Sequence, residues 1–218
     1  MWVYGSYTRR MISAVFFDFG GVILSSPFDA FSHYERRAGL EPDTIRRLNA
    51  TSPDDNAWAR LERGELDVEQ FVVAFEDEAR ATGVELDGRE VLACLRGEVR
   101  PAMVTALERC AESFSTALLT NNFVSGTPEW SSGGSFAALV PLFDVIVESS
   151  TAGCRKPERR FYEIALDRVG VSADEVVFLD DLGINLKPAR EMGMRTIKVG
   201  DPDRAIAELE AVVGISLR

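Results

Sequence analysis

Histidine and cysteine are scarce in this sequence, which limits the metal sites and catalytic groups that it can build. Its 218 residues include one histidine, His33, and three cysteines, Cys94, Cys110 and Cys154. A histidine-rich zinc site is therefore excluded, and a Ser-His-Asp triad would depend on that one residue. We expect His33 to be structural or exposed. The cysteines are odd in number and form no Cys-x-x-Cys pair, which is typical of reduced thiols in a cytoplasmic protein.

Basic residues are outnumbered by acidic ones. There are 24 Lys and Arg against 35 Asp and Glu, and the formal net charge is -11. Nucleic acids and anionic membranes are bound by clustered basic residues, so the composition argues against both partners. It does not exclude a small phosphate ester, because a metal ion and a few placed donors can reverse the local field.

Long hydrophobic runs are also lacking. No segment approaches the ~20 apolar residues of a membrane span, and residues 1–10 lack the apolar centre of a signal peptide. We interpret that segment as a frayed leader or an upstream start before Met11. No Gly-x-x-x-x-Gly-Lys-Ser/Thr motif occurs, which excludes a P-loop ATPase. The apolar content of 46% still allows a sizeable core.

Short apolar runs alternate with helical patterns along much of the chain. Each run is too short for a buried helix and is typical of a parallel strand covered on both faces. Five such strands are predicted, at residues 14–17, 116–120, 143–147, 175–179 and 195–199. The alternation predicts a doubly wound α/β fold with a parallel sheet.

Residues 26–96 show helical patterns without a strand pattern. Four helix starts are predicted, each at a capping residue or a proline: Ser26-Pro27, Pro42, Ser52-Pro53 and Asp67. Because this segment lies between the first two strands, we interpret it as a helical cap inserted into the core. The predicted domains are an α/β core of residues 11–25 and 97–218 and a cap of residues 26–96.

Polar residues follow the predicted strands. Asp18, Thr120 and the pair Asp180-Asp181 follow the first, second and fourth strands, and Lys156 lies in the loop after the third. Each alone could be an ordinary turn or capping residue. Ligands of an open parallel sheet bind beyond the carboxyl ends of its strands, so we expect these side chains to meet there.

The chemistry of this set is specific. Carboxylates from two strand ends with a backbone carbonyl form a hard oxygen site suited to Mg²⁺. An aspartate such as Asp18 can act as a nucleophile and form an aspartyl-phosphate. Lys156, Thr120 and loop amides could stabilise phosphoryl transfer.

Four motifs carry a resemblance to a known superfamily. They are Phe17-Asp18-Phe19-Gly20-Gly21-Val22, Leu118-Leu119-Thr120-Asn121-Asn122, Arg155-Lys156-Pro157, and Val177-Phe178-Leu179-Asp180-Asp181 with Asn185 and Ala189. In order and spacing they resemble the haloacid dehalogenase (HAD) superfamily, over nearly the whole chain. Residues 179–190 closely resemble the N-terminal phosphatase domain of soluble epoxide hydrolases. They are similar also to the HAD domain of certain acyl-CoA dehydrogenase family proteins.

The resemblance implies a Rossmann-like core with a cap after the first motif, Mg²⁺ dependence and a small phosphate monoester as substrate. It also implies a role for each matching residue. The implied nucleophile is Asp18; the implied metal ligands are Asp18, Asp180, Asp181 and the carbonyl of Gly20; the implied phosphate-binding residues are Thr120, Lys156, Gly21 and Asn121; and Asn185 would support the metal ligands.

One position departs from the superfamily pattern. Its phosphatases usually read Asp-x-Asp in the first motif, and the second Asp protonates the leaving group and then activates water. Gly20 stands there, a loss expected to lower the rate about 10²- to 10⁴-fold where the leaving group needs a proton.

Three alternatives follow from Gly20. A phosphatase could act on good leaving groups or take an acid from Asp180, Asp181 or the cap. A dehalogenase needs no such proton, although dehalogenases of the superfamily typically carry an aromatic residue at this position. A domain without turnover could bind a phosphorylated ligand or a partner protein.

Substrate specificity is predicted to depend on the cap and the loop that faces it. The candidates are Phe28, Trp58, Arg60, Phe71, Phe123 and Trp130, although each aromatic could equally pack in a core. Such a pocket is compatible with lipid phosphates, on which the epoxide hydrolase phosphatase domains act, but sugar and other organic phosphates stay open. A homodimer is compatible with the sequence.

Overall fold

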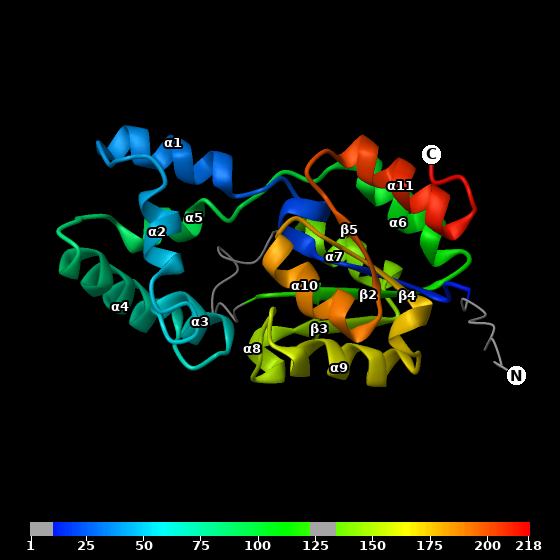
Figure 1. Ribbon diagram of the computed structural model, residues 1–218. Coiled ribbons are helices and arrows are strands. Elements are labelled where there is room, and N and C mark those ends of the chain that lie inside the picture. The colour runs from blue at the N-terminus through cyan, green and yellow to red at the C-terminus, as the bar shows by residue number, and fades with distance from the viewer. Residues whose placement is uncertain (1–10, 123–133) are drawn as a thin grey trace, which may run out of the picture.

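The protein is built around a five-stranded parallel sheet, which Figure 1 shows in a computed structural model that describes residues 11–122 and 134–218. The strand order is β3-β2-β1-β4-β5. The strands are β1 Ala14–Phe17, β2 Ser115–Thr120, β3 Val145–Glu148, β4 Val176–Asp180 and β5 Arg195–Lys198. This sheet, with helices on both faces, confirms the predicted doubly wound α/β fold.

The central strand β1 requires cover on both faces. Val15 and Phe17 pack into one hydrophobic cluster and Ala14 and Phe16 into another, and all four are fully buried. A continuous apolar run is needed because successive side chains of a strand point to opposite faces. The helices that contribute are α6 Pro101–Ala111 and α11 Pro202–Val213 on the first face, and α9 Arg159–Val169 and α10 Gly183–Met192 on the second (Figure 1).

Some predicted boundaries differ from the structure. The third strand begins at Val145, two residues later than predicted. Phe143 instead caps the end of η2, the 3-10 helix Val140–Leu142. The fourth begins at Val176 because Ala173–Glu175 form another 3-10 turn, η3. Two short helices, α7 Gly134–Leu139 and α8 Ser149–Ala152, were not predicted.

Five helices lie between β1 and α6 and confirm the helical cap. They are α1 Phe28–Ala38, α2 Thr44–Ala50, α3 Ala57–Glu62, α4 Val68–Ala81 and α5 Gly88–Ala93. Phe71 and Phe75 of α4, Leu61 of α3 and Ile45 of α2 are fully buried in one cluster that contains no residue of the sheet. The cap therefore has a hydrophobic core of its own.

Two cap helices test the predicted starts. Asp67 caps α4 as predicted, and Gln70 completes a capping box with it. The predicted start of α3 at Ser52-Pro53 is wrong. Ser52 adopts a left-handed φ of 47°, and the chain turns until Asn56, whose side chain accepts a hydrogen bond from Ala59 N.

The two segments that join cap and core run side by side. Leu24 and Val99 form an antiparallel bridge, and the backbone N–H of Arg100 donates to Ile23 O at 2.9 Å. The proposed limits of the cap, residues 26–96, fall at this pair of linkers.

Several expectations from composition concern single residues. Cys94, Cys110 and Cys154 are free thiols, and His33 is exposed on the cap. Among residues 11–122 and 134–218, no helix combines the length and apolar character needed to cross a membrane.

Candidate active site

The loop after β1 presents the first carboxylate. Asp18 is buried, and its Oδ1 accepts a hydrogen bond from Phe19 N at 2.7 Å. A tight turn, η1 Phe19–Ile23, follows and contains Gly20 and Gly21, whose backbone angles are not helical. Gly20 has an ordinary φ of -68°, whereas Gly21 has a left-handed φ of 76° that favours glycine.

Lys156 lies at the centre of the site. Its side chain is only 1% exposed, and Nζ lies 2.8 Å from Asp18 Oδ1 and 2.8 Å from Asp180 Oδ2. Burial alone would lower the pKa of Lys156, but the charges of Asp18 and Asp180 outweigh it and the pKa is raised. The ammonium group is therefore charged and held between two strand ends.

Asp180 and Asp181 are adjacent in sequence but have different surroundings. Besides Lys156, the wholly buried Asp180 carboxylate accepts hydrogen bonds from Leu182 N at 2.8 Å and from Asn185 Nδ2 at 3.1 Å. Asp181 is half-buried and accepts one long hydrogen bond, from Ser26 Oγ at 3.4 Å. Asp180 is thus fixed by the protein, while Asp181 is the less constrained carboxylate.

The three carboxylates form a cluster. Asp18, Asp180 and Asp181 each place one oxygen within 4.8 Å of the others, and Lys156 is the ammonium among them. Burial raises the pKa of Asp18, although Lys156 opposes this effect, and burial together with the Asp180 charge raises the pKa of Asp181 to about 6. The protein alone therefore compensates these negative charges poorly, and a hard divalent cation such as Mg²⁺ fits the donor set.

We expect Gly21→Ala to weaken Mg²⁺ binding about 10-fold, the lower end of the range for residues that support metal ligands. A Cβ at this position would overlap the Asp181 carboxylate, so the carboxylate must move. Isothermal titration with Mg²⁺ measures the affinity. Gly39→Ala is the matched control, because Gly39 has a φ of 70° but nothing within 4 Å of its Cβ position. Unchanged affinity in Gly21→Ala would contradict the prediction that Asp181 is a metal ligand.

Thr120 and Asn121 lie at the end of β2. Thr120 is buried and pairs in register with Glu148 of β3. The Asn121 side chain binds the backbone of Lys156 twice: its Oδ1 accepts from Lys156 N at 2.9 Å, and its Nδ2 donates to Lys156 O at 3.0 Å. The Asn121 side chain therefore supports the Lys156 loop, and the phosphate contact predicted for this residue would have to come from its backbone.

Three residues near the site were missed by the sequence analysis. Glu62 of α3 accepts a hydrogen bond from Asn121 Nδ2 at 3.0 Å, Ser26 contacts Asp181, and Arg100 Nη1 donates to the carbonyl of Gly21 at 2.6 Å. Each comes from the cap or its linkers. No motif or spacing marks them, because their positions depend on how the cap packs on the core.

The predicted specificity residues have different environments. Phe71 is fully buried in the cap core, which agrees with the core-packing alternative and not with a place in the substrate site. Trp58 is 8% exposed and packs edge-on against Phe71, with 4.9 Å between the ring centroids. Its Nε1 has no hydrogen-bond partner in the part of the chain that the structure describes. Phe28 is half-buried beneath Arg46, and Arg60 lies 3.8 Å from Glu65. The remaining two candidates, Phe123 and Trp130, lie outside the described residues.

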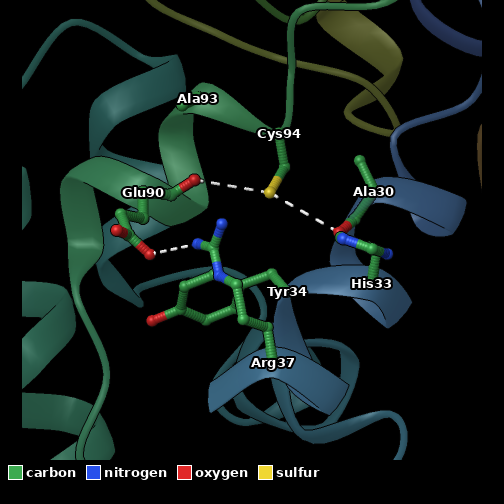
Figure 2. Close-up of a pocket in the computed structure, with 7 residues that line it drawn as sticks. All are labelled: Ala30, His33, Tyr34, Arg37, Glu90, Ala93 and Cys94. Atoms are coloured by element: carbon green, nitrogen blue, oxygen red, sulfur yellow. Dashed lines mark hydrogen bonds and ion pairs between the residues drawn. The ribbon is translucent and has the colours of Figure 1, made fainter.

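A separate pocket of about 440 Å³ lies on the cap between α1 and the end of α5 (Figure 2). His33, Tyr34 and Arg37 of α1 and Glu90 of α5 line it, and Arg37 Nη2 donates to Glu90 Oε2 at 2.5 Å. Its lining shares no residue with the carboxylate cluster.

The family model for haloacid dehalogenase-like hydrolases matches residues 12–193. The chain belongs to this family. The matched part of this HAD-like hydrolase runs from β1 through the cap to the end of α10 and contains Asp18, Thr120, Lys156 and Asp181. The resemblance noted from the four motifs is therefore confirmed.

Three curated relatives have informative names. The HAD-like chain is 36% identical over 215 residues to acyl-CoA dehydrogenase family member 10 of Mus musculus, covering 95% of this chain and 20% of that protein. It is 32% identical over 219 residues to bifunctional epoxide hydrolase 2 of Sus scrofa, covering 94% and 40%. Phosphatase MT3486 of Mycobacterium tuberculosis is 31% identical over 202 residues, covering 86% and 87%. The chain thus spans less than half of the first two relatives.

A solved HAD-family structure shares the fold. The enzyme bt-2542 of Bacteroides thetaiotaomicron, in complex with magnesium and inorganic phosphate, superposes with a TM-score of 0.59 at 17% identity and covers 87% of this chain and 96% of its own. At this identity the similarity supports the fold alone.

Proposed function

We propose that this HAD-like hydrolase is a Mg²⁺-dependent phosphatase that cleaves a small organic phosphate monoester through an aspartyl-phosphate on Asp18. The observation that carries the proposal is the Lys156 ammonium held 2.8 Å from both Asp18 and Asp180, beside the less constrained Asp181. This arrangement combines a fixed nucleophile, a cation for phosphoryl oxygens and carboxylates for a metal. Relatives named as phosphatases support it.

Asp18 would begin the reaction. Its Oδ1 is held by Phe19 N and Lys156 Nζ, which fixes the carboxylate for attack on phosphorus. The new oxygen–phosphorus bond replaces the bond to the ester oxygen, which leaves with the substrate's organic group. Water then attacks the aspartyl-phosphate, releases inorganic phosphate and restores the carboxylate.

Other residues would hold the phosphoryl group and metal. Lys156 Nζ and Thr120 would bind phosphoryl oxygens, with backbone groups of Gly21 and Asn121. Bound Mg²⁺ supplies positive charge that offsets the charge of the transferring group. Its ligands would come from Asp18, Asp180, Asp181 and the Gly20 carbonyl, and Asp180 would also hold Lys156.

The leaving group determines which substrates fit. Because Gly20 provides no proton, esters with good leaving groups, such as an anomeric sugar phosphate, are favoured over simple alkyl phosphates.

We also propose a cytoplasmic location, which the three free cysteines support.

A second candidate function is favoured by the same glycine. A domain that binds a phosphorylated ligand without turnover would need the phosphate and metal groups but no acid-base residue at Gly20. Saturable binding of inorganic phosphate with undetectable hydrolysis would support this function.

We expect the protein to release phosphate from para-nitrophenyl phosphate in millimolar Mg²⁺, and chelation with EDTA to abolish the release. Activity should return with Mg²⁺ but less with Ca²⁺, which prefers larger and more flexible oxygen sites. Colorimetric phosphate detection measures the rate. Absence of release above background would contradict the proposal. A panel of lipid, sugar and other phosphate monoesters under the same conditions then identifies the substrate class.

A further inference from the structure

Glu62, the last residue of cap helix α3, reaches across to the core beside the strand ends. Its Oε2 accepts a hydrogen bond from Asn121 Nδ2 at 3.0 Å and lies 2.6 Å from Arg155 Nε. The side chains of Glu62 and Arg155 are each 17% exposed. The cap thus places one largely buried carboxylate against Asn121, which follows Thr120, and Arg155, which precedes Lys156.

Asn121 links this carboxylate to Lys156. Its amide exchanges two hydrogen bonds with the backbone of Lys156, at 2.9 and 3.0 Å. The same Nδ2 donates to Glu62, which adds a third hydrogen bond to the amide and supports the orientation that directs its oxygen to Lys156 N. The Lys156 backbone in turn sets where Nζ lies between Asp18 and Asp180.

We propose that Glu62 is a positioning residue, supplied by the cap, that aligns Asn121 and the Arg155-Lys156 segment for phosphate binding. The inference rests on the proposed phosphate-binding function of Lys156. A displacement of about 1 Å in a group that binds the substrate can lower the rate by about 10²-fold, even when the substituted residue does not touch the substrate.

A neighbouring contact separates positioning from simple attachment of the cap. Arg63, the next residue, joins cap to core through Glu158 at 2.9 Å, and Gly64 lies against the backbone of Ser150. In the described part of the chain, the Arg63 side chain contacts Glu158, Glu65 and the carbonyl of Asp54, and forms no hydrogen bond or ion pair with Asn121 or Lys156. Loss of Arg63 therefore weakens cap attachment without disturbing the amide pair.

The test compares Glu62→Ala, Glu62→Gln and Arg63→Ala with the unmodified protein. Titration with inorganic phosphate in saturating Mg²⁺ measures binding, and para-nitrophenyl phosphate gives kcat and KM. We expect Glu62→Ala to weaken phosphate binding about 10-fold and to lower kcat/KM about 10- to 100-fold. Arg63→Ala should stay within about twofold of the unmodified protein, because its side chain contacts Glu158 and the carbonyl of Asp54 and not the amide of Asn121. Glu62→Gln should recover part of the loss, because its oxygen still accepts from Asn121 Nδ2.

The outcomes distinguish this inference from the proposed function. Phosphate binding without turnover would contradict the phosphatase, and the binding constants of the variants would still decide the role of Glu62. Equal losses in Glu62→Ala and Arg63→Ala, or no loss in Glu62→Ala, would overturn the inference. Absence of phosphate binding in the unmodified protein would overturn both. If Glu62→Ala fails to fold, Glu62→Leu replaces it, because leucine removes the acceptor for Asn121 Nδ2 but keeps much of the side-chain volume. A decrease in phosphate affinity would support the inference, and unchanged affinity would overturn it.

Discussion

Asp18→Asn should abolish phosphate release while leaving the protein folded. An amide has nearly the same shape as a carboxylate but cannot attack phosphorus to form an aspartyl-phosphate. Loss of a nucleophile typically lowers kcat by about 10⁴-fold or more. Stopped assays with para-nitrophenyl phosphate and Mg²⁺ measure the loss. Residual turnover within about tenfold of the unmodified protein would show that Asp18 is not the nucleophile.

Stability provides an internal check on this variant. The pKa of Asp18 is raised in the folded protein, mainly by burial, with Lys156 opposing and Asp180 adding to the effect. A folded-state pKa above the unfolded value means that the ionised side chain opposes folding near neutral pH. The neutral amide removes this opposition, so thermal unfolding without metal should occur at an unchanged or higher temperature. Asp77→Asn is the matched control, because Asp77 is 59% exposed on the cap.

Gly20→Asp should raise the rate about 10²- to 10⁴-fold on alkyl phosphates, whose leaving groups need a proton. Gly20 has φ -68° and ψ 132°, which any residue can adopt, and a Cβ built there meets no atom within 4 Å. The backbone and Cβ of an aspartate are therefore accommodated at this position without strain. On para-nitrophenyl phosphate, whose leaving group is weakly basic, the gain should be much smaller.

The control for this experiment is Gly20→Asn, which has the same size but cannot transfer the proton. Steady-state kinetics give the rate on an alkyl phosphate divided by the rate on an aryl phosphate for each variant, and this ratio should rise in Gly20→Asp but not in Gly20→Asn. An unchanged alkyl phosphate rate in Gly20→Asp would mean that another group already serves as the acid. Equal gains in Gly20→Asp and Gly20→Asn would assign the effect to packing.

The sequence predicted the sheet edge well because few residues determine it. Parallel strands place their carboxyl ends together, so Asp18, Thr120 and Asp180 had to converge once their strands were recognised. Lys156 was predicted from its loop after β3, and it lies among the carboxylates. The different roles of Asp180 and Asp181 could not be predicted, because they depend on hydrogen bonds from Leu182 and Asn185.

The cap was predicted less well, for identifiable physical reasons. The helical spacing of Phe71 fitted both a core stripe and a ligand pocket, and burial in the cap core decided the question. The start of α3 was predicted at a proline, whereas the side chain of Asn56 caps the helix after a left-handed turn at Ser52. Glu62 has no local signature, since its partners lie 59 residues away at Asn121 and further on at Arg155.

The paired linkers constrain how the cap can move. Because Leu24 and Val99 are bridged, the two tethers form one short ribbon and cannot bend independently. Any rotation of the cap relative to the core would thus occur about one axis at this pair of linkers. Arg100 belongs to this ribbon through Ile23 O, and its side chain holds the carbonyl of Gly21. Rotation of the cap would therefore shift the loop that carries Asp18. Opening of the site to substrate and alignment of the Asp18 carboxylate would then change together.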